Sequence, residues 1–548
     1  MTIVEIVGVL GEIIMKKYFL KFKYYILGEF ALNIVSTIAL SSIPYLQKLL
    51  IDRAFLNHDL HYFIKLSVYF AFILGVYFLS TWGANTLLII RLNNMKGLMT
   101  KDLFKSIVSL KHGEFSKRDV GEYMSMQSND INIITGDYIE PFLNLIENIL
   151  NISIYAVSIC IYINIGMSAL IFSISILICL VPKIMEKKLS TARKEQIDAM
   201  GRYTSNTKDY LDGFKLINIR TRKNINERHV NDVHQVVDAI KRADSLEVFS
   251  SLLYGLATKI LDIIVFIVSI LLVVKGKMEL GSVIAVLTYV TCYSGLFEDF
   301  LYDVSIINSS KNVRDGFLSC VNAPRHTENT DKEHFEKEIC ISNVSLKYEH
   351  FQINNLNYVF KKGKKYAIVG HSGAGKSTLV NILMKYVNID SGSITIDGEN
   401  INDIDTDKIM GFIGQKNHIY KSDFKNNTTV FGAYDDEKVN ECISNLENSN
   451  ILLDNILPSE DCNELSGGEK QLTSFIRNIA GSYDILIMDE PFAALDRDSL
   501  SKIMRVLSEL NNTVIMITHD ISDNLKYFDY VLQLENGSIV ENNGLFNK

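Results

Sequence analysis

Six stretches of the chain are apolar over lengths that fit a membrane interior. The hydrocarbon core of a bilayer is about 30 Å thick, and a helix needs about 20 mostly apolar residues to cross it. The stretches span residues 24–46, 62–90, 142–163, 166–186, 252–275 and 282–304. They predict an all-α membrane domain with six transmembrane helices. The segment 2–15 is shorter and carries two glutamates, so we expect an interfacial helix there.

The distribution of basic residues indicates how these helices are oriented. Lysine and arginine are enriched before the first stretch, within 91–118 and within 183–223, whereas the turn at 164–166 has no charge. Because loops rich in Lys and Arg stay on the cytosolic side, both ends of the chain are expected in the cytosol. The two long inner segments, 91–141 and 187–250, are polar and periodic, which predicts helices that continue from the spans into the cytosol.

The last part of the chain has a different character. Over all 548 residues, 48% are hydrophobic, 22% are charged and the net charge is −8, which argues against disorder and against nucleic acid as a partner. The seven cysteines show no paired spacing for a zinc site. We expect a transmembrane domain at 1–322, a polar linker at 323–338, and an α/β domain with a mainly parallel sheet at 339–548.

One loop of this α/β domain has the spacing of a phosphate-binding loop. Residues 370–378 read Gly-His-Ser-Gly-Ala-Gly-Lys-Ser-Thr and follow an apolar strand. Glycines let backbone N–H groups curl around phosphates, and the start of the following helix favours an anion. The lysine is expected to reach the β- and γ-phosphates, and the next serine to ligate Mg²⁺. The predicted nucleotide-binding residues are Gly370, Ser372, Gly373, Gly375, Lys376, Ser377 and Thr378.

Two further motifs follow along the chain. Four apolar residues at 485–488 predict a buried strand that ends in Asp489 and Glu490. The first acid can hold Mg²⁺, and the second is placed to polarise an attacking water as a general base. Before this strand, residues 465–469 read Leu-Ser-Gly-Gly-Glu ahead of a predicted helix. Adjacent glycines at a helix start expose N–H groups, which predicts a second anion-binding surface.

The order of these motifs resembles the ATP-binding cassette (ABC) transporter family, and the six spans resemble its exporter-type half-transporters. The resemblance implies ATP and Mg²⁺ as cofactors and assigns roles by position. The catalytic residues would be Glu490, His519, Gln415 and Lys376. The metal contacts would be Ser377, Gln415 and Asp489. Beyond the phosphate loop, the nucleotide contacts would be Tyr348, stacked on adenine, together with Gln415, Ser466, Gly468 and Asp496.

The resemblance also implies a dimer, because the Ser466–Gly468 loop of one subunit closes on the ATP held by Lys376 of another. Segments 111–122 and 209–220 resemble the coupling loops of exporters. Three departures from the family pattern stand out: Glu469 replaces the usual Gln, Phe492-Ala493 replaces Thr-Ser, and the segment 457–464 lacks the usual exporter sequence. We expect these departures to affect the coupling between the cassette and the coupling loops, and to leave ATP binding intact.

The expected function is an ATP-driven exporter that moves a peptide, lipid, drug or other amphipathic molecule out of the cytosol. The alternatives are an importer of the same fold, for example for iron–siderophore complexes, and a protein whose ATP use gates a channel. The expected partners are a second half-transporter, the lipid bilayer and the substrate, in a bacterial inner membrane. Glu29, Asp262 and Glu298 are hypothesised to face a shared cavity that favours a cationic or amphipathic substrate.

Overall fold

A computed structural model of the protein describes residues 13–55, 58–163, 165–178, 181–322, 330–347, 352–415, 417–518, 523–535 and 537–541. The chain forms two compact units. The first contains Met1–Val108 and Asp119–Ala323, and the second contains Ser109–Arg118 and Pro324–Lys548. The expected transmembrane domain at 1–322 is therefore interrupted, because a short segment within it belongs structurally to the second unit.

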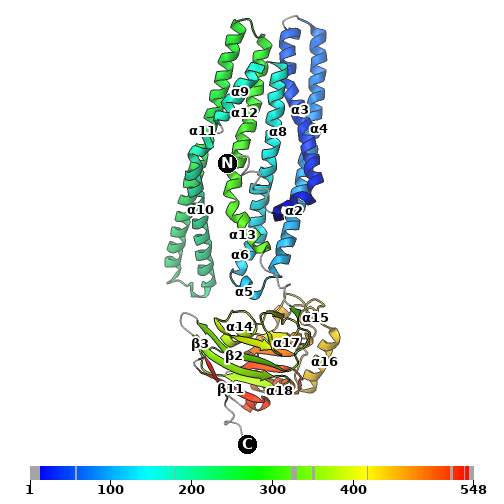
Figure 1. Ribbon diagram of the computed structural model, residues 1–548, viewed down its shortest axis with the longest axis vertical. Helices are drawn as coiled ribbons and strands as arrows, with labels where there is room; N and C mark the ends of the chain where they lie inside the picture. The colour runs from blue at the N-terminus through cyan, green and yellow to red at the C-terminus, as the bar shows by residue number, and fades with distance from the viewer. Residues whose placement is uncertain are drawn as a thin grey trace. The chain divides into compact units, whose positions relative to one another are not determined.

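The first unit consists of long helices that run alongside one another (Figure 1). Their bounds are α2 Ile13–Lys21, α3 Lys23–Leu49, α4 Leu60–Ile107, α6 Val120–Ser125, α7 Ile131–Ile133, α8 Glu140–Tyr162, α9 Ile165–Ile178, α10 Val181–Asp212, α11 Arg222–Val274, α12 Leu280–Ser309 and α13 Lys311–Val321. π-Helical turns at Leu50–Phe55, Met126–Asp130 and Ile134–Ile139 extend or join these helices.

Five of the described helical segments are long and apolar enough to cross a membrane: Lys23–Ala54, Leu60–Ile107, Val120–Tyr162, Arg222–Val274 and Leu280–Val304. Each contains one of the expected spans or most of one. The fourth expected span, 166–186, is divided between α9 and α10, and residues 179 and 180 lie outside the described part of the chain. The expected interfacial helix at 2–15 also lies almost entirely outside it.

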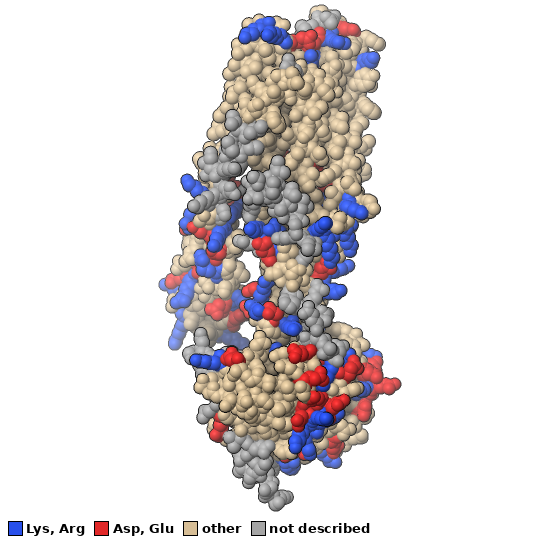
Figure 2. Space-filling view, viewed as in Figure 1, with Lys and Arg blue, Asp and Glu red and all other residues tan. Residues whose placement is uncertain are grey.

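The long inner segments are helical, as their periodicity predicts. Helix α4 has 48 residues and α11 has 53. At 1.5 Å per residue, each is more than twice as long as the ~30 Å hydrocarbon core. Figure 2 shows charged side chains gathering over the lower half of α10 and α11, whereas the upper part of the helices is nearly free of them below a charged rim at its top end. The 91–141 segment differs from expectation in one respect, since it is interrupted where 109–118 joins the second unit.

The second unit is built on a six-stranded sheet in the order β12-β11-β4-β10-β9-β8. Strands β8 to β11 and β4 are parallel, and only β12 is antiparallel to its neighbour. The strand bounds are β4 Lys365–Val369, β8 Met410–Ile413, β9 Ile485–Asp489, β10 Thr513–Ile517, β11 Tyr530–Glu535 and β12 Ser538–Glu541. The predicted parallel sheet is confirmed, and the buried strand predicted at 485–488 corresponds to β9.

A second sheet, which the sequence did not predict, is antiparallel in the order β3-β2-β5-β6. Its strands are β2 Glu338–Lys347, β3 Gln352–Lys361, β5 Ser391–Ile396 and β6 Glu399–Asn400. A short parallel pair joins β1 Thr330–Asp331 to β7 Ile404–Asp405. The helices are α5 His112–Phe115, α14 Lys376–Leu383, α15 Phe424–Thr429, α16 Asp436–Asn448, α17 Gly467–Ala480 and α18 Arg497–Glu509. All six described cysteines are free thiols.

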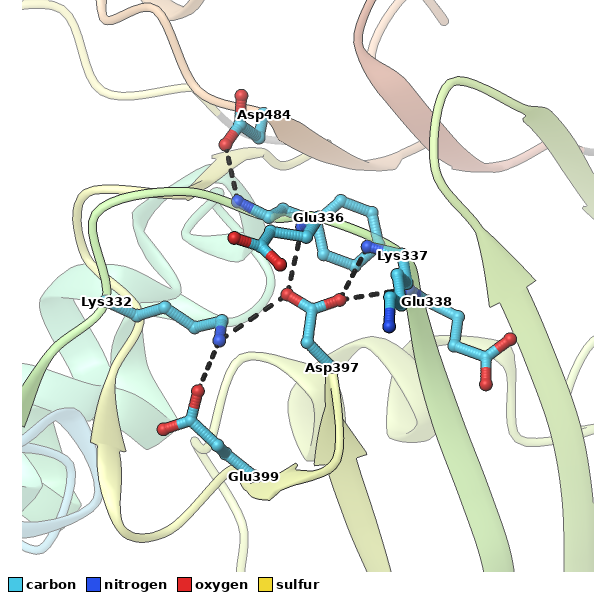
Figure 3. Close-up of polar contacts among 8 residues, drawn as sticks. Lys332, Glu336, Lys337, Glu338, Asp397, Glu399 and Asp484 are labelled. Carbon is cyan, nitrogen blue, oxygen red and sulfur yellow. Dashed lines mark hydrogen bonds and ion pairs between the residues drawn. The ribbon is translucent and has the colours of Figure 1, made fainter.

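The described part of the expected linker, 330–338, is fixed to the second unit. Phe335 is fully buried in its core, and the Phe335 backbone N–H donates to Asp484 Oδ2 at 2.7 Å. Asp397, in the turn between β5 and β6, accepts the N–H groups of residues 336, 337 and 338 at 2.9, 2.7 and 3.1 Å (Figure 3). Lys332 Nζ lies 3.4 Å from the same carboxylate. Residues 330–338 are therefore held against the second unit and do not form a free connection between domains.

Removing the Asp397 carboxylate should lower the stability of the second unit, because the segment 330–338 would lose its hydrogen bonds to this side chain. Burial alone would raise the pKa of Asp397, but its three backbone donors and the Lys332 ammonium lower that pKa below its usual range. Hydrogen bonds to a charged group contribute about 1.5–3 kcal/mol each, so we expect Asp397→Ala to cost about 2–4 kcal/mol once partial compensation by water is included. Thermal unfolding of the purified protein measures this loss.

The pH dependence has a defined sign. Because the folded pKa is depressed, the stabilisation is complete above the unfolded value of about 4 and is lost as the pH falls through the folded value. The difference in Tm between wild type and Asp397→Asn should therefore shrink on acidification. Glu399→Gln is the matched control, because Glu399 is exposed and its described partner is the same Lys332; it should cost less than about 1 kcal/mol. Equal losses of stability in Asp397→Ala and Glu399→Gln would contradict the role of Asp397 in holding this segment.

Candidate functional site

The predicted functional loops meet at one edge of the six-stranded sheet. Strands β4, β10, β9 and β8 are consecutive neighbours and all parallel, so their carboxyl ends lie side by side. The phosphate loop follows β4, Thr518 follows β10, Glu490 follows β9, and Gln415 lies two residues beyond β8. Open parallel sheets bind ligands at this edge. Residues separated by more than 100 positions in the sequence are thereby brought into one site.

The phosphate loop has an open face and a buried lysine. Gly373 and Gly375 have φ values of 82° and 98°, a region that favours glycine, and an added Cβ at Gly373 would meet no atom within 4 Å. Lys376 begins α14 and is 6% exposed. The Lys376 ammonium donates to the carbonyl oxygens of Gly370 at 2.8 Å and of His371 at 3.0 Å. Ser372 and Ser377 are exposed and Thr378 is half-buried.

The two acids after β9 differ in conformation. Asp489 is the last residue of the strand, whereas Glu490 has a φ of 49°, which is uncommon for a residue with a side chain. The Glu490 backbone N–H donates to the Ile517 carbonyl of β10 at 3.1 Å, which holds the turn. Gln415 Nε2 donates to Glu490 Oε2 at 3.1 Å. Strained backbone that the surrounding structure maintains is a feature of functional sites, and here it carries the predicted general base.

The Leu-Ser-Gly-Gly-Glu motif forms the start of α17. Ser466 is the N-cap, and its hydroxyl accepts the Glu469 N–H at 3.4 Å. Glu469 Oε2 accepts the Ser466 N–H at 2.8 Å, which completes a capping box. Hydrogen bonds from Ser466 lower the pKa of Glu469. Ser466 and Gly467 are exposed, so the first turn of the helix is accessible.

The start of α17 packs against the loop 494–496 of the same unit. A Cβ at Gly468 would lie 2.9 Å from Leu495 Cδ2 and 3.3 Å from the Ala494 carbonyl oxygen, so the helix start packs tightly on this loop and a side chain there would force a local shift. Gln471 is 7% exposed, and its Oε1 accepts the Ala494 N–H at 3.1 Å. Asp496 is the N-cap of α18 and accepts from the Ser499 N–H at 2.9 Å, which lowers its pKa. The two motifs therefore form one connected surface.

Not every predicted site residue can be placed. Tyr348 and His519 lie outside the described residues. Sequence reasoning also missed two residues of α17 whose side chains bind the backbone of neighbouring loops. One is Gln471, and the other is Arg477, whose guanidinium donates to the carbonyls of Asn427 at 2.7 Å and His418 at 2.8 Å. Their only sequence signal is their position on α17, one and three turns after its start.

The residue that replaces Thr in the family pattern has a structural role. Phe492 is 5% exposed and packs edge-on against Phe475 of α17, with ring centroids 5.6 Å apart. It therefore fills the core between the Glu490 turn and α17. Residues 457–461, before the motif, lead into a short 3₁₀ turn at Cys462–Glu464 that carries one exposed acidic side chain, Glu464.

The hypothesis of a shared acidic cavity in the first unit is wrong for Glu29. Its carboxylate is 2% exposed and pairs with Arg91, with Nε–Oε2 and Nη2–Oε1 distances of 2.9 and 3.2 Å. Asp262 lies 2.9 Å from Lys259 Nζ on α11, and Glu298 accepts from the Thr258 hydroxyl at 2.8 Å. The Glu29 and Asp262 carboxylates therefore each pair with a cationic side chain of the same unit.

Comparisons with known proteins cover both units. A family model for the ABC transporter matches residues 353–493, and one for the ABC transporter transmembrane region matches residues 27–297. An ATP-dependent lipid A-core flippase of Haemophilus influenzae is 24% identical over 93% of this chain and 89% of that protein. The flippase of Vibrio cholerae is 22% identical, with 93% and 91% covered. The structure of a bacterial Atm1-family ABC exporter with ATP bound has a TM-score of 0.83, at 17% identity, over 95% of this chain and 94% of that one.

Proposed function

The chain belongs to the ABC transporter family as a half-transporter, and from this premise we propose that it exports an amphipathic substrate from the cytosol at the expense of ATP. The observation that carries the proposal is the convergence of the phosphate loop, the acid pair and Gln415 at one sheet edge, in a chain that also has membrane-length helices. ATP hydrolysis coupled to transport is the activity that this combination supports. The protein is a multi-pass membrane protein, placed in the bacterial inner membrane with its nucleotide-binding unit in the cytosol.

The residues at the sheet edge fit ATP with Mg²⁺. Mg²⁺ is commonly held by one or two carboxylates together with substrate phosphates, and it neutralises charge between the β- and γ-phosphates. Ser377 and Asp489 are the oxygen donors proposed to hold it. Lys376 would exchange its two loop carbonyls for phosphate oxygens. Glu490 would accept a proton from the attacking water, with Gln415 fixing the orientation of its carboxylate through their hydrogen bond.

We propose a dimer of two such chains, which supplies the second half of each nucleotide site. The exposed start of α17, at Ser466 and Gly467, lies in a different loop from the phosphate-binding residues, and its free face is available to ATP held by a partner. The partner is either a second copy or a related half-transporter. Mass measurement of the purified complex separates these two cases.

The names of the relatives support a proposal for the substrate class. The flippases of Haemophilus influenzae and Vibrio cholerae are named for lipid A-core, an amphipathic lipid, and the structural relative is named an exporter. None of these relatives is an importer, so the importer alternative gains no support from them. We propose an amphipathic molecule with a lipid-like apolar part as the substrate of this chain.

Reconstituted vesicles test both activity and direction. Vesicles with outward-facing nucleotide sites receive Mg-ATP outside, and a fluorescent lipid analogue in the outer leaflet or medium reports movement. Export corresponds to ATP-dependent transfer to the inner leaflet or lumen, absent in Lys376→Ala. ATP-dependent movement only in the opposite direction, or ATP hydrolysis without any movement, would contradict the proposal.

The tip of the α10–α11 hairpin is expected to couple ATP use to transport. Leu216 and Ile219 are 72% and 90% exposed, and Leu211 and Phe214 of the same segment are 63% and 67% exposed. Such residues at the end of a cytosolic extension favour docking on another surface. We expect Leu216→Ser/Ile219→Ser to reduce substrate-stimulated ATPase at least about fivefold, a coupling of about 1 kcal/mol, while basal ATPase persists. Thr221→Ser, in the same turn, is the control. Full stimulation in the double variant would argue against this role.

A further inference from the structure

Glu469 is the one charged residue in the Leu-Ser-Gly-Gly-Glu motif, and the structure gives its carboxylate a specific position. It is the third residue of α17, and its Oε2 accepts the N–H of the N-cap residue Ser466 at 2.8 Å. Asn455 is a second hydrogen-bond partner. Within the described part of the chain, the carboxylate makes no ion pair with a lysine or arginine. Its negative charge is therefore compensated chiefly by the first turn of the helix.

This arrangement uses groups that would otherwise receive an anionic ligand. The free N–H groups of the first helical turn and the helix dipole together favour one negative charge. In this chain that charge is already present, because the Ser466 N–H donates to Glu469 and the carboxylate lies within the first turn. A phosphate approaching Ser466 must displace the carboxylate or accept its repulsion.

We propose that Glu469 competes with the γ-phosphate of ATP for the start of α17 and so weakens ATP-driven closure of the dimer. This inference rests on the proposed function, in which the partner's ATP docks on Ser466–Gly468. The competition acts on ATP and not on ADP, because only the γ-phosphate reaches this motif in that arrangement. Glu469 is thus a positioning residue that raises the ATP concentration needed for closure.

Glu469→Gln isolates the charge. Glutamine keeps the length of the side chain and an oxygen that can accept the Ser466 N–H, so the capping box is retained. ATPase activity is measured against ATP concentration in the full-length protein, together with inhibition by ADP. The KM for ATP should fall about twofold to fivefold, which is the range expected for an exposed charge at a helix N-terminus. The inhibition constant for ADP should stay within twofold.

Ionic strength separates charge competition from a merely structural role. Because the interaction is electrostatic at an accessible surface, the KM difference between Glu469→Gln and wild type should narrow as salt is raised towards 1 M, where the Debye length is about 3 Å. Glu464→Gln, which changes the net charge equally from an exposed position outside the helix, is the matched control and should leave the KM unchanged.

The outcomes distinguish this inference from the proposed function. A KM for Glu469→Gln within twofold of wild type, a KM that rises, or a difference that is insensitive to salt overturns the inference. In each of those cases the proposed function still stands if Lys376→Ala abolishes ATP-dependent transport. If wild type itself neither hydrolyses ATP nor transports, it is the proposed function that fails.

Discussion

Glu490→Gln is expected to lower ATP hydrolysis by a factor of 100 or more, the order of magnitude that general-base catalysis contributes. The geometry supports the large effect. Glu490 follows β9 in a turn with φ of 49°, and it is held there by a backbone bond to β10 and a side-chain bond from Gln415. A neutral amide in the same position can still bond to Gln415 but cannot accept a proton from water. Steady-state ATPase measures the loss.

ATP binding should survive this substitution, because Glu490 is not among the phosphate-binding residues. The apparent affinity for ATP, measured with a fluorescent analogue, is expected to stay within about threefold of wild type, less than 1 kcal/mol. Glu509→Gln is a suitable control, since that carboxylate is exposed on α18 and pairs only with Arg505 among the described residues. Turnover in Glu490→Gln within tenfold of wild type would reject Glu490 as the base. It would leave Asp489 as the alternative.

The strand, turn and helix elements that carry the predicted nucleotide-binding motifs could be predicted because these motifs are short and local. The phosphate loop lies within nine consecutive residues, and the acid pair directly follows its own buried strand. In each case the local chain determines the strand, the turn and the side chains at its end. The parallel sheet then brings these ends together without further information, since carboxyl ends of parallel strands share an edge.

Contacts between distant segments could not be predicted in this way. Phe335 is the single large apolar residue in a charged stretch, and its burial depends on acceptors at 397 and 484 that nothing in the stretch itself indicates. Similarly, Gln471 is 23 residues from the Ala494 amide that it holds. The segment 109–118 was assigned to the membrane domain because both its flanks belong there. Sequence periodicity describes a helix, but it does not identify what the helix contacts.

The membrane helices illustrate the same limit for charged residues. Each apolar stretch predicted a helix, because length and composition suffice for that. Whether a charge within such a helix faces a cavity or a neighbour depends on packing. Glu29 and Arg91 are 62 positions apart and lie on α3 and α4, so only the arrangement of these two helices shows that they form a buried pair.

Arg91→Met is expected to be the most destabilising single substitution in the first unit. Arg91 is fully buried and Glu29 is 2% exposed. Removing one partner of a buried ion pair leaves the other charge without compensation and costs about 3–5 kcal/mol. The Nη1 atom of Arg91 is itself buried with no described hydrogen-bond partner, so the pair is satisfied mainly through its two bonds to Glu29. Thermal unfolding and the yield of monodisperse protein in detergent measure the effect.

The double substitution Glu29→Leu/Arg91→Met tests the physical reason. If the cost arises from an uncompensated carboxylate, removing both charges should restore most of the stability, because apolar side chains of similar volume can replace a buried pair at little cost. Lys17→Gln is the control for an exposed ion pair to the same helix α4, since Lys17 lies on α2, is 58% exposed and pairs with Asp102; it should cost less than about 1 kcal/mol. A double variant no more stable than Arg91→Met would mean that Arg91 contributes through packing, whereas a fully stable Arg91→Met would mean that Glu29 is neutral or hydrated.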